Sequence, residues 1–228
     1  MSESLSRTPL HAFHVAQGGR MVPFAGWEMP VQYTGIIEEH LAVRRAAGLF
    51  DVSHMGECRV SGPDAADFLE RVMTNTMTTI PVGMARYTIL CQPDGGCVDD
   101  LIVYRLGADE FLICLNASNA AKDIAWLRAQ AGSAKLTITD ECARWAQLAL
   151  QGPLAESILA GLTSAALPAI KRFGFVMATV AGIEGCIVSR TGYTGSPGFE
   201  IYLPAAGATA VAEAILAAGK PKGLLLAG

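Results

Sequence analysis

Residues 86–115 read RYTILCQPDGGCVDDLIVYRLGADEFLICL, and this stretch decides the fold class. It contains three apolar runs, which cover residues 86–91, 98–105 and 110–115. The short connections PDGG and GAD between them are rich in residues typical of tight turns. The pattern therefore predicts an antiparallel meander rather than strands joined by helical crossovers.

The sequence on either side of the meander predicts further strands and helices. The further strands are expected at residues 57–60, 146–150, 176–180, 183–189 and 199–203. The helices are expected at residues 35–47, 63–73, 153–160 and 205–218, with one more beginning at Asn116 or Ser118 and burying Ile124 and Leu127. Residues 1–34 are expected to be irregular. Paired strands followed by helices indicate an α+β fold, and a weak echo between the halves suggests two related subdomains.

Two end segments have less regular expectations. Thr34 and Gly48 are typical start and stop residues for the helix at 35–47, whose apolar stripe contains Ile37 and Leu41. The C-terminal residues GLLLAG leave two alternatives, a final buried strand or loop, or a chain cut in mid-fold.

Composition narrows the class of protein. The 228 residues contain 17 Lys and Arg against 21 Asp and Glu, a net charge of −4, which argues against nucleic acid as the main partner. Hydrophobic residues make up 51% of the chain, which excludes disorder, and no apolar run is long enough to span a membrane. Because residues 1–4 do not start a secretory signal, we expect a cytoplasmic protein.

The cysteines and histidines do not indicate a metal site. No two of the six cysteines form a C-x-x-C pair, and most lie inside apolar runs, so we expect reduced, structural thiols and no metal. Asp51, Ser53 and His54 are too close in sequence to form a nucleophile–base–orienter triad.

Asp99 and Asp100 enter an apolar strand directly after Gly95 and Gly96. Neighbouring strand residues point to opposite faces, so one aspartate should meet solvent and the other should point to the core or a cavity. Two interpretations stay open. Both residues could cap the turn, or one could bind an amine-bearing substrate or hold a proton for it.

The segment SRTGYTGSPGFEIY at residues 189–202 combines glycines, one aromatic ring and a strand glutamate. Glycine permits close approach of the backbone to a ligand, and the Tyr193 ring could stack on a flat one. An inward Glu200 would need paired donors, such as the edge of a 2-aminopyrimidinone. The alternative is a glycine-rich hairpin with a surface glutamate.

Motifs spread over the whole chain resemble the aminomethyltransferase, or T protein, family of the glycine cleavage system. They are TPLH at 8–11, VPFAGWEMPVQY at 22–33, GLFDVSHMG at 48–56, GG at 95–96 with DDL at 99–101, NASN at 116–119, LQGP at 150–153 and SRTGYTG at 189–195. Together they are specific, although none alone would suffice.

The resemblance implies a fold and a reaction. The fold would be two intertwined α/β subdomains with antiparallel meanders, residues 1–50 with 141–228 forming the first and residues 51–140 the second. The reaction would be tetrahydrofolate-dependent transfer from the lipoyl arm of the partner H protein, which gives 5,10-methylene-tetrahydrofolate, ammonia and a reduced lipoyl arm.

The resemblance also implies roles for single residues. Asp100 matches the key acid beside the folate N5/N10 region, and Glu200 matches the carboxylate that grips the pterin edge. Tyr193 and Tyr87 match pocket aromatics. Met55 and Asn116 match weaker pocket positions.

Two departures from the family pattern affect these expectations. Ser196 and Pro197 stand where the family usually has two acidic residues, and Pro197 could shift the pterin contact. The family also continues into a C-terminal β-barrel domain and an arginine that these residues lack, so the fragment is expected to be inactive alone.

Three alternatives to aminomethyl transfer stay open. The chain could act on another one-carbon donor, such as dimethylglycine, sarcosine or a sulfonium compound, without needing H protein. It could be a non-catalytic folate-binding module, although it contains no cysteine motif typical of the family's iron–sulfur assembly relatives. Finally, it could be a folded fragment without activity.

Overall fold

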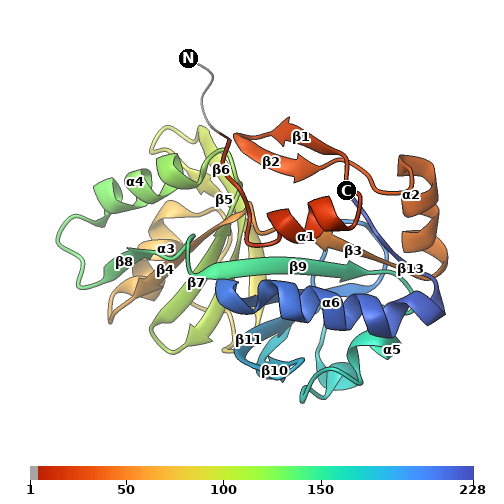
Figure 1. Cartoon of the computed structure of the whole chain (residues 1–228). Helices are drawn as coiled ribbons and strands as arrows, with labels where there is room; N and C mark the ends of the chain where they lie inside the picture. Colours follow the sequence, from red (N-terminus) through yellow and green to blue (C-terminus); the bar gives the residue numbers. More distant parts are fainter. Residues whose placement is uncertain (1–4) are drawn as a thin grey trace. The chain divides into compact units, whose positions relative to one another are not determined.

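The computed structural model describes residues 5–228, so the absence of a secretory signal at residues 1–4 concerns residues outside the described part. The chain divides into two compact units. Unit 1 comprises the described residues up to His54 together with Arg144–Gly228, and unit 2 comprises Met55–Ala143. Unit 2 is thus an insertion between the two segments of unit 1 (Figure 1).

Unit 1 is built on a six-stranded sheet of order β10-β11-β12-β9-β3-β13, in which only the β3–β13 pair is parallel. The strands of this sheet are β3 (Ala47–Asp51), β9 (Trp145–Gln151), β10 (Phe175–Val180), β11 (Ile183–Ser189), β12 (Gly198–Pro204) and β13 (Leu224–Leu226). Two further strands of unit 1, β1 (Met21–Phe24) and β2 (Trp27–Pro30), form a separate two-stranded sheet. The helices of unit 1 are α1 (His11–Ala16), α2 (Ile36–Arg45), α5 (Ala155–Leu159) and α6 (Ala208–Gly219), with 3-10 turns at Leu167–Ala169, Ala205–Gly207 and Lys220–Lys222. In Figure 1, α6 runs along β9, and Val211 and Ile215 of this helix are fully buried in the unit 1 core.

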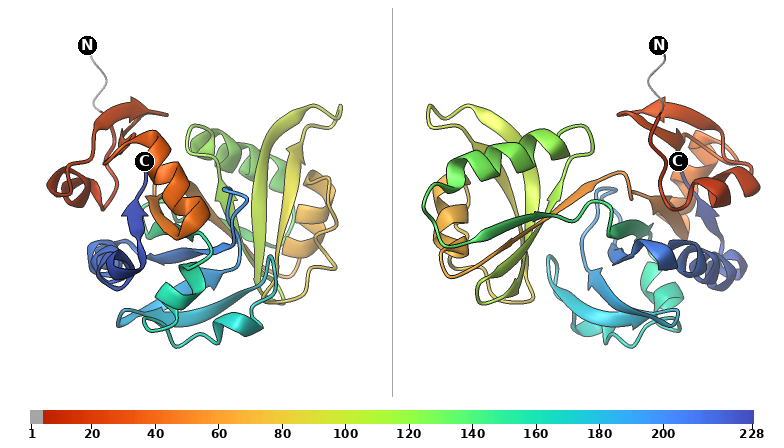
Figure 2. Two further views of the ribbon diagram at one scale, coloured as in Figure 1. Left: turned by 90° about the vertical axis from the view of Figure 1, so that its right-hand side faces the viewer. Right: turned by 60° about the vertical axis from the view of Figure 1, so that its left-hand side comes forward.

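Unit 2 is a five-stranded sheet of order β5-β6-β7-β4-β8 with two helices. Its elements are β4 (Gly56–Ser61), α3 (Ala65–Val72), β5 (Ala85–Cys91), β6 (Cys97–Gly107), β7 (Glu110–Leu115), α4 (Ala120–Ala131) and β8 (Thr137–Asp140). Strands β5 and β6 form the long yellow-to-green hairpin in Figure 2. Phe68 of α3, Leu127 of α4 and Val103 of β6 share one core cluster, so both helices cover the same face of the sheet.

The predicted α+β fold with antiparallel meanders is confirmed. The meander at residues 86–115 is present as β5-β6-β7, and the second-half strands are present as β9, β10, β11 and β12. At the C-terminus, Leu224–Leu226 form strand β13, which pairs with β3, and Leu224 is buried.

The expectation that residues 1–34 are irregular is wrong. They contain α1 and the hairpin β1–β2. The hairpin turn consists of Ala25 and Gly26, which both have positive φ, 49° and 82°. This is the backbone geometry of a tight turn that joins right-twisted strands, but Ala-Gly is not one of the usual sequence signals for it.

The helix at 35–47 differs from its prediction in its limits and in its buried face. Helix α2 covers Ile36–Arg45, and Gly48 lies inside strand β3. Ile37 is 77% exposed, whereas Glu39 is buried. The Glu39 carboxylate accepts backbone N–H groups of the preceding turn at 2.6–3.0 Å, so it fills the capping role expected of Thr34. Capping therefore decides which face of α2 turns inward.

Candidate functional site

The two adjacent aspartates of β6 point to opposite faces of the unit 2 sheet. Asp99 pairs with the buried Leu90 and is only 7% exposed, whereas Asp100 pairs with Ile89 and is exposed. The predicted division, one carboxylate inward and one outward, is confirmed. The outward Asp100 is the one that can meet a ligand from solvent.

Asp100 is hydrogen-bonded to two of the other predicted site residues, Tyr87 and Asn116. The Tyr87 hydroxyl donates a hydrogen bond to Asp100 Oδ2 at 2.9 Å. Asn116 Nδ2 donates to the Asp100 backbone oxygen at 2.8 Å and to Asp99 Oδ1 at 3.0 Å. The structure therefore brings Asp100, Tyr87 and Asn116 together, although they come from three different segments of unit 2.

The expected start of α4 needs a correction that bears on this cluster. The residue before the helix is Asn119, not Asn116 or Ser118, and its side chain does not cap the helix. Instead, Asn119 Nδ2 donates to Asp99 Oδ1 at 3.0 Å, beside the bond from Asn116. The two asparagines thus serve the buried aspartate.

Met55 lies half-buried in the turn that leads into β4. No polar role follows from a thioether there, and its pocket role stays a prediction.

Glu200 lies on β12 of unit 1 and is partly buried. Gln147 Nε2 donates to Glu200 Oε1 at 3.2 Å and also contacts the buried Tyr202 hydroxyl at 3.1 Å. Burial raises the pKa of Glu200, and hydrogen bonds from Thr191 and Gln147 offset only part of this rise. The carboxylate therefore has capacity for further N–H donors.

Tyr193 lies in the loop between β11 and β12, and its side chain is fully exposed. The ring is thus not packed against Glu200 and is free to contact a ligand. It lines a cavity of about 320 Å³ together with Phe50, Thr194 and Ala227.

Gln151 holds this loop in place. Its Oε1 accepts the Thr194 hydroxyl at 3.0 Å, and its Nε2 donates to the backbone oxygen of Thr191 at 3.2 Å. Gly192, at φ 154°, is required for this approach, because a Cβ there would lie 2.0 Å from Gln151 Oε1. Gln151 occurs in the LQGP motif, but strand periodicity alone gives it no special role.

The Ser196–Pro197 departure is accommodated within the same loop. Ser196 Oγ accepts a hydrogen bond from Arg44 Nη1 at 2.8 Å, and the Pro197 backbone oxygen accepts the Gly152 N–H at 2.7 Å. The Arg44 guanidinium therefore binds a neutral hydroxyl at this position.

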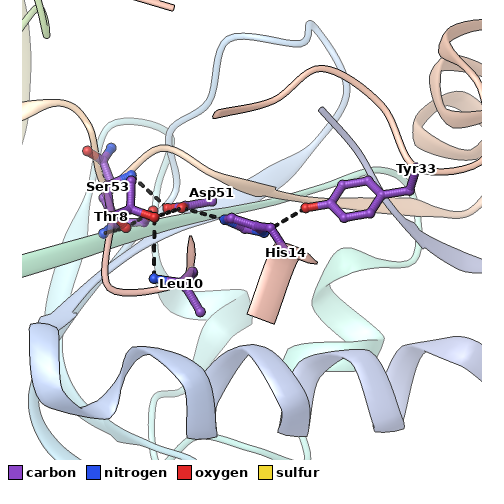
Figure 3. A network of polar contacts seen from close by, with 7 residues as sticks. Thr8, Leu10, His14, Tyr33, Asp51 and Ser53 are labelled. Atoms are coloured by element: carbon purple, nitrogen blue, oxygen red, sulfur yellow. Dashed lines mark hydrogen bonds and ion pairs between the residues drawn. The ribbon is translucent and has the colours of Figure 1, made fainter. Parts of the chain in front are cut away.

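Asp51 and His14 form a buried network that the sequence analysis missed (Figure 3). His14 Nε2 lies 2.8 Å from Asp51 Oδ2, and the Tyr33 hydroxyl lies 2.7 Å from His14 Nδ1. Thr8 Oγ1 donates to Asp51 Oδ2 at 2.7 Å, and the Ser53 N–H donates to Asp51 Oδ1 at 2.9 Å. The histidine partner of Asp51 is therefore distant in sequence, not the neighbouring His54.

This network continues toward Glu200. The Ser53 hydroxyl and the Gln147 N–H are 3.0 Å apart, and the Gln147 side chain reaches Glu200. The N-terminal segment of unit 1 is thereby joined through buried hydrogen bonds to the strand pair that positions Glu200.

Two features relevant to cofactors and membranes do not occur in residues 5–228. Three or more His, Cys, Asp or Glu side chains grouped as for a metal ion do not occur in that range. Likewise, none of its helices is long and apolar enough to cross a bilayer.

Comparison with known proteins assigns the family. Residues 10–228 match the family described as the GCVT N-terminal domain. The chain belongs to this family. The match confirms the resemblance drawn from the sequence motifs.

Individual relatives carry the name aminomethyltransferase. One from Desulforamulus reducens is 51% identical over 222 residues, which cover 97% of this chain and 60% of the relative. One from Bacillus subtilis is 46% identical over 224 residues, which cover 98% of this chain and 62% of the relative. The chain thus spans about 60% of the length of these relatives.

One solved structure agrees with the family assignment, and a second shares the fold. The glycine cleavage system aminomethyltransferase T from Bartonella henselae superposes with a TM-score of 0.90 at 35% identity, covering 99% of this chain and 60% of that one. The heterotetrameric sarcosine oxidase from Corynebacterium has a TM-score of 0.66 at 19% identity over 96% of this chain and 97% of that one, a likeness of fold alone.

Proposed function

We propose that this chain forms the folate-binding part of an aminomethyltransferase of glycine cleavage. The reaction transfers the methylene carbon of an aminomethyl group, carried on the lipoyl arm of H protein, to tetrahydrofolate. The products are 5,10-methylene-tetrahydrofolate, ammonia and the reduced lipoyl arm. Family membership and the relatives' name support this proposal.

The observation that carries the proposal is the setting of Asp100. Its carboxylate is exposed to solvent but held in one orientation by the Tyr87 hydroxyl at 2.9 Å, beside the Asn116 amide. A fixed, accessible carboxylate can orient an amine and accept or return a proton as folate N5 attacks the aminomethyl carbon. A carboxylate that only capped the turn would not need this support.

Glu200 would bind the pterin edge in the proposed complex. Two adjacent N–H groups of the pterin suit the two oxygens of a carboxylate, and charge-assisted bonds of this kind give strength and orientation. The raised pKa of Glu200, caused by burial, means that its charge lacks full solvation in the free protein. Ligand N–H donors would supply what water does not.

The remaining predicted residues have supporting roles. The exposed Tyr193 ring is free to stack on a flat ligand, and Tyr87 and Met55 would contribute further contact surface. Asn116 directs its amide nitrogen to acceptors of its own chain, which leaves its carbonyl oxygen for a ligand donor.

The test measures binding and transfer separately. Tetrahydrofolate binding to this chain is measured by calorimetry for the wild type, Asp100→Asn and, as a control of equal charge change, the exposed Asp67→Asn. Ammonia release is then followed with lipoylated H protein as donor, in this chain and in a version with the relatives' length. The second comparison tests the expectation that residues 1–228 alone do not support transfer.

We expect Asp100→Asn to abolish transfer in the longer version while the unfolding transition stays unchanged, with Asp67→Asn behaving as the wild type. Normal transfer by Asp100→Asn would overturn the role of this residue. Transfer from sarcosine or dimethylglycine without H protein would instead place the chain with the alternative one-carbon donors.

A further inference from the structure

A second carboxyl group lies against the buried Asp99. Asp123, in the first turn of α4, has no exposed surface, and Asp99 is 7% exposed. Asn119, one helical turn before Asp123, donates its amide to Asp99 Oδ1 at 3.0 Å, so the start of α4 lies against Asp99. The two carboxyl groups lie within hydrogen-bonding reach of each other. Neither side chain has a part in the proposed chemistry.

Two ionised carboxylates could not make this contact, because each has only acceptor atoms. Asp99 Oδ1 is already occupied by the amides of Asn116 and Asn119. Asp99 Oδ2 and Asp123 Oδ2 are buried without a hydrogen-bond donor, and Asp123 Oδ1 has the Lys122 ammonium 3.2 Å away as an ion-pair partner. A single proton between the two groups satisfies them, since it converts one acid into a donor to the other.

We propose that Asp99 and Asp123 share one proton and together act as positioning residues for Asn116 and Asp100. This inference rests on the proposed function, because it concerns the support of Asp100.

The positioning follows from the donors that Asp99 collects. Asn116 Nδ2 lies 3.0 Å from Asp99 Oδ1 and 2.8 Å from the Asp100 backbone oxygen, and both of these atoms accept. Only the nitrogen end of the amide fits there, so the carbonyl end is directed away. Because the same amide donates to the Asp100 backbone oxygen, Asn116 also joins the buried Asp99 to the strand at the point where Asp100 points outward.

The electrostatics place the shared proton on Asp123. Burial, followed by the Asp99 contact, raises the pKa of Asp123 to about 7. Burial also acts to raise the pKa of Asp99, but hydrogen bonds from Asp123, Asn116 and Asn119 lower it below its usual range. A charged side chain beside the pair is Lys122, which is half exposed and whose Nζ lies 3.2 Å from Asp123 Oδ1. Loss of the proton near neutral pH would set two buried negative charges against each other.

The experiment compares three variants with the wild type. Asp123→Asn keeps a donor toward Asp99 but cannot titrate, and Asp123→Leu removes the donor. Asp67→Asn is the matched control, because Asp67 also lies in the first turn of a unit 2 helix, α3, but is exposed. The first readout is the infrared C=O band of a protonated carboxyl group between pH 5 and 9. The second is the NMR signal of the Asn116 side-chain NH₂ over the same range.

We expect the wild type and Asp67→Asn to lose one carboxyl band near pH 7 and to shift the Asn116 signal at the same pH. Asp123→Asn should show neither change and should keep the low-pH Asn116 signal, whereas Asp123→Leu should displace it at every pH. Tetrahydrofolate affinity should fall above pH 7 in the wild type and stay constant in Asp123→Asn, with a loss of about tenfold in Asp123→Leu for one missing hydrogen bond.

The two proposals fail in different ways. If the wild type loses no carboxyl band near pH 7, or the Asn116 signal moves identically in Asp123→Asn, the shared proton or its positioning role is refuted, whatever binds. If tetrahydrofolate fails to bind any form while both spectroscopic readouts behave as expected, the proposed function is refuted and the carboxyl pair stands.

Discussion

Replacing Asp51 by alanine tests the buried network of unit 1. Its side chain is 1% exposed and accepts from Thr8, His14 and the Ser53 N–H at 2.7, 2.8 and 2.9 Å. Because a carboxylate only accepts, His14 Nε2 is the donor of this contact, and the Tyr33 hydroxyl lies 2.7 Å from the other ring nitrogen, Nδ1. Burial raises the pKa of Tyr33, which keeps its hydroxyl a donor.

The magnitude follows from the three donors that Asp51→Ala leaves buried. Removing one partner of a buried charged cluster costs about 3–5 kcal/mol, a large share of the roughly 5–15 kcal/mol that stabilises a domain. In a chain of this size, each kcal/mol lowers the melting temperature by about 2–4 °C. We therefore expect a fall of roughly 10 °C or more, measured by thermal and urea unfolding, with exposed Asp67→Ala as the control.

The effect of Asp51 should also depend on pH with a definite sign. Although burial acts to raise the pKa of Asp51, hydrogen bonds from His14, Ser53 and Thr8 lower it below its usual range. A depressed carboxyl pKa stabilises the fold above the unfolded value of about 3.9, and this contribution is lost as pH falls through the folded pKa. A stability loss below about 1 kcal/mol at pH 7 would show that desolvation cancels the contacts, contrary to this reasoning.

Three further substitutions have expected outcomes. Glu200→Gln should weaken tetrahydrofolate binding by about tenfold to a hundredfold in calorimetry, the value of a charged hydrogen bond. Because burial raises the pKa of Glu200, this variant should not lose stability at pH 8. Unchanged affinity would exclude the pterin contact. Gly192→Ala should cost about 1–3 kcal/mol in urea unfolding, since its Cβ would meet Gln151, while Gly195→Ala, with its nearest neighbouring atom 3.9 Å away, should cost less; equal losses would refute the packing argument. Burial, followed by the charges of Glu141 and Asp140, raises the pKa of the buried Glu57 to about 9. The Glu57 contribution to wild-type stability should therefore fall by about 1.4 kcal/mol per pH unit as pH rises from the unfolded pKa to 9. Glu57→Gln should flatten this slope when unfolding is measured at several pH values.

The regular elements could be predicted where local pattern and burial agree. In residues 86–115, turn residues and apolar runs coincide, and the meander appears as expected. In helix α2 they disagree, because the Glu39 carboxylate caps the preceding turn and the apolar Ile37 stays exposed. The hairpin at residues 21–30 escaped prediction because its turn adopts positive φ at an alanine, which propensity disfavours.

The candidate site divides in the same way. Strand alternation is local, so it predicts that one of Asp99 and Asp100 is buried without any knowledge of the fold. The partner of the buried aspartate is not local: Asp123 comes from a helix that follows another strand and a turn. A signal was nevertheless present, since Asp123 occupies the same helix stripe as the buried Leu127, four residues later.

An acid on an apolar stripe is costly unless it is neutral or paired, so such a residue marks a constraint rather than a solvated surface. On β6 the buried acid Asp99 is the direct neighbour of Asp100, the residue proposed for chemistry, and the two point to opposite faces of the sheet. Asp99 turns inward and accepts from Asn116 and Asn119. The exposed Asp100 carboxylate accepts from the Tyr87 hydroxyl at 2.9 Å and, at the longer distance of 3.5 Å, from the Asn116 amide. The adjacent pair thus separates support from reactivity. Asp99→Asn should therefore impair the function of Asp100 although Asp100 itself is intact, because the outward acid would lie on a strand that has lost its support.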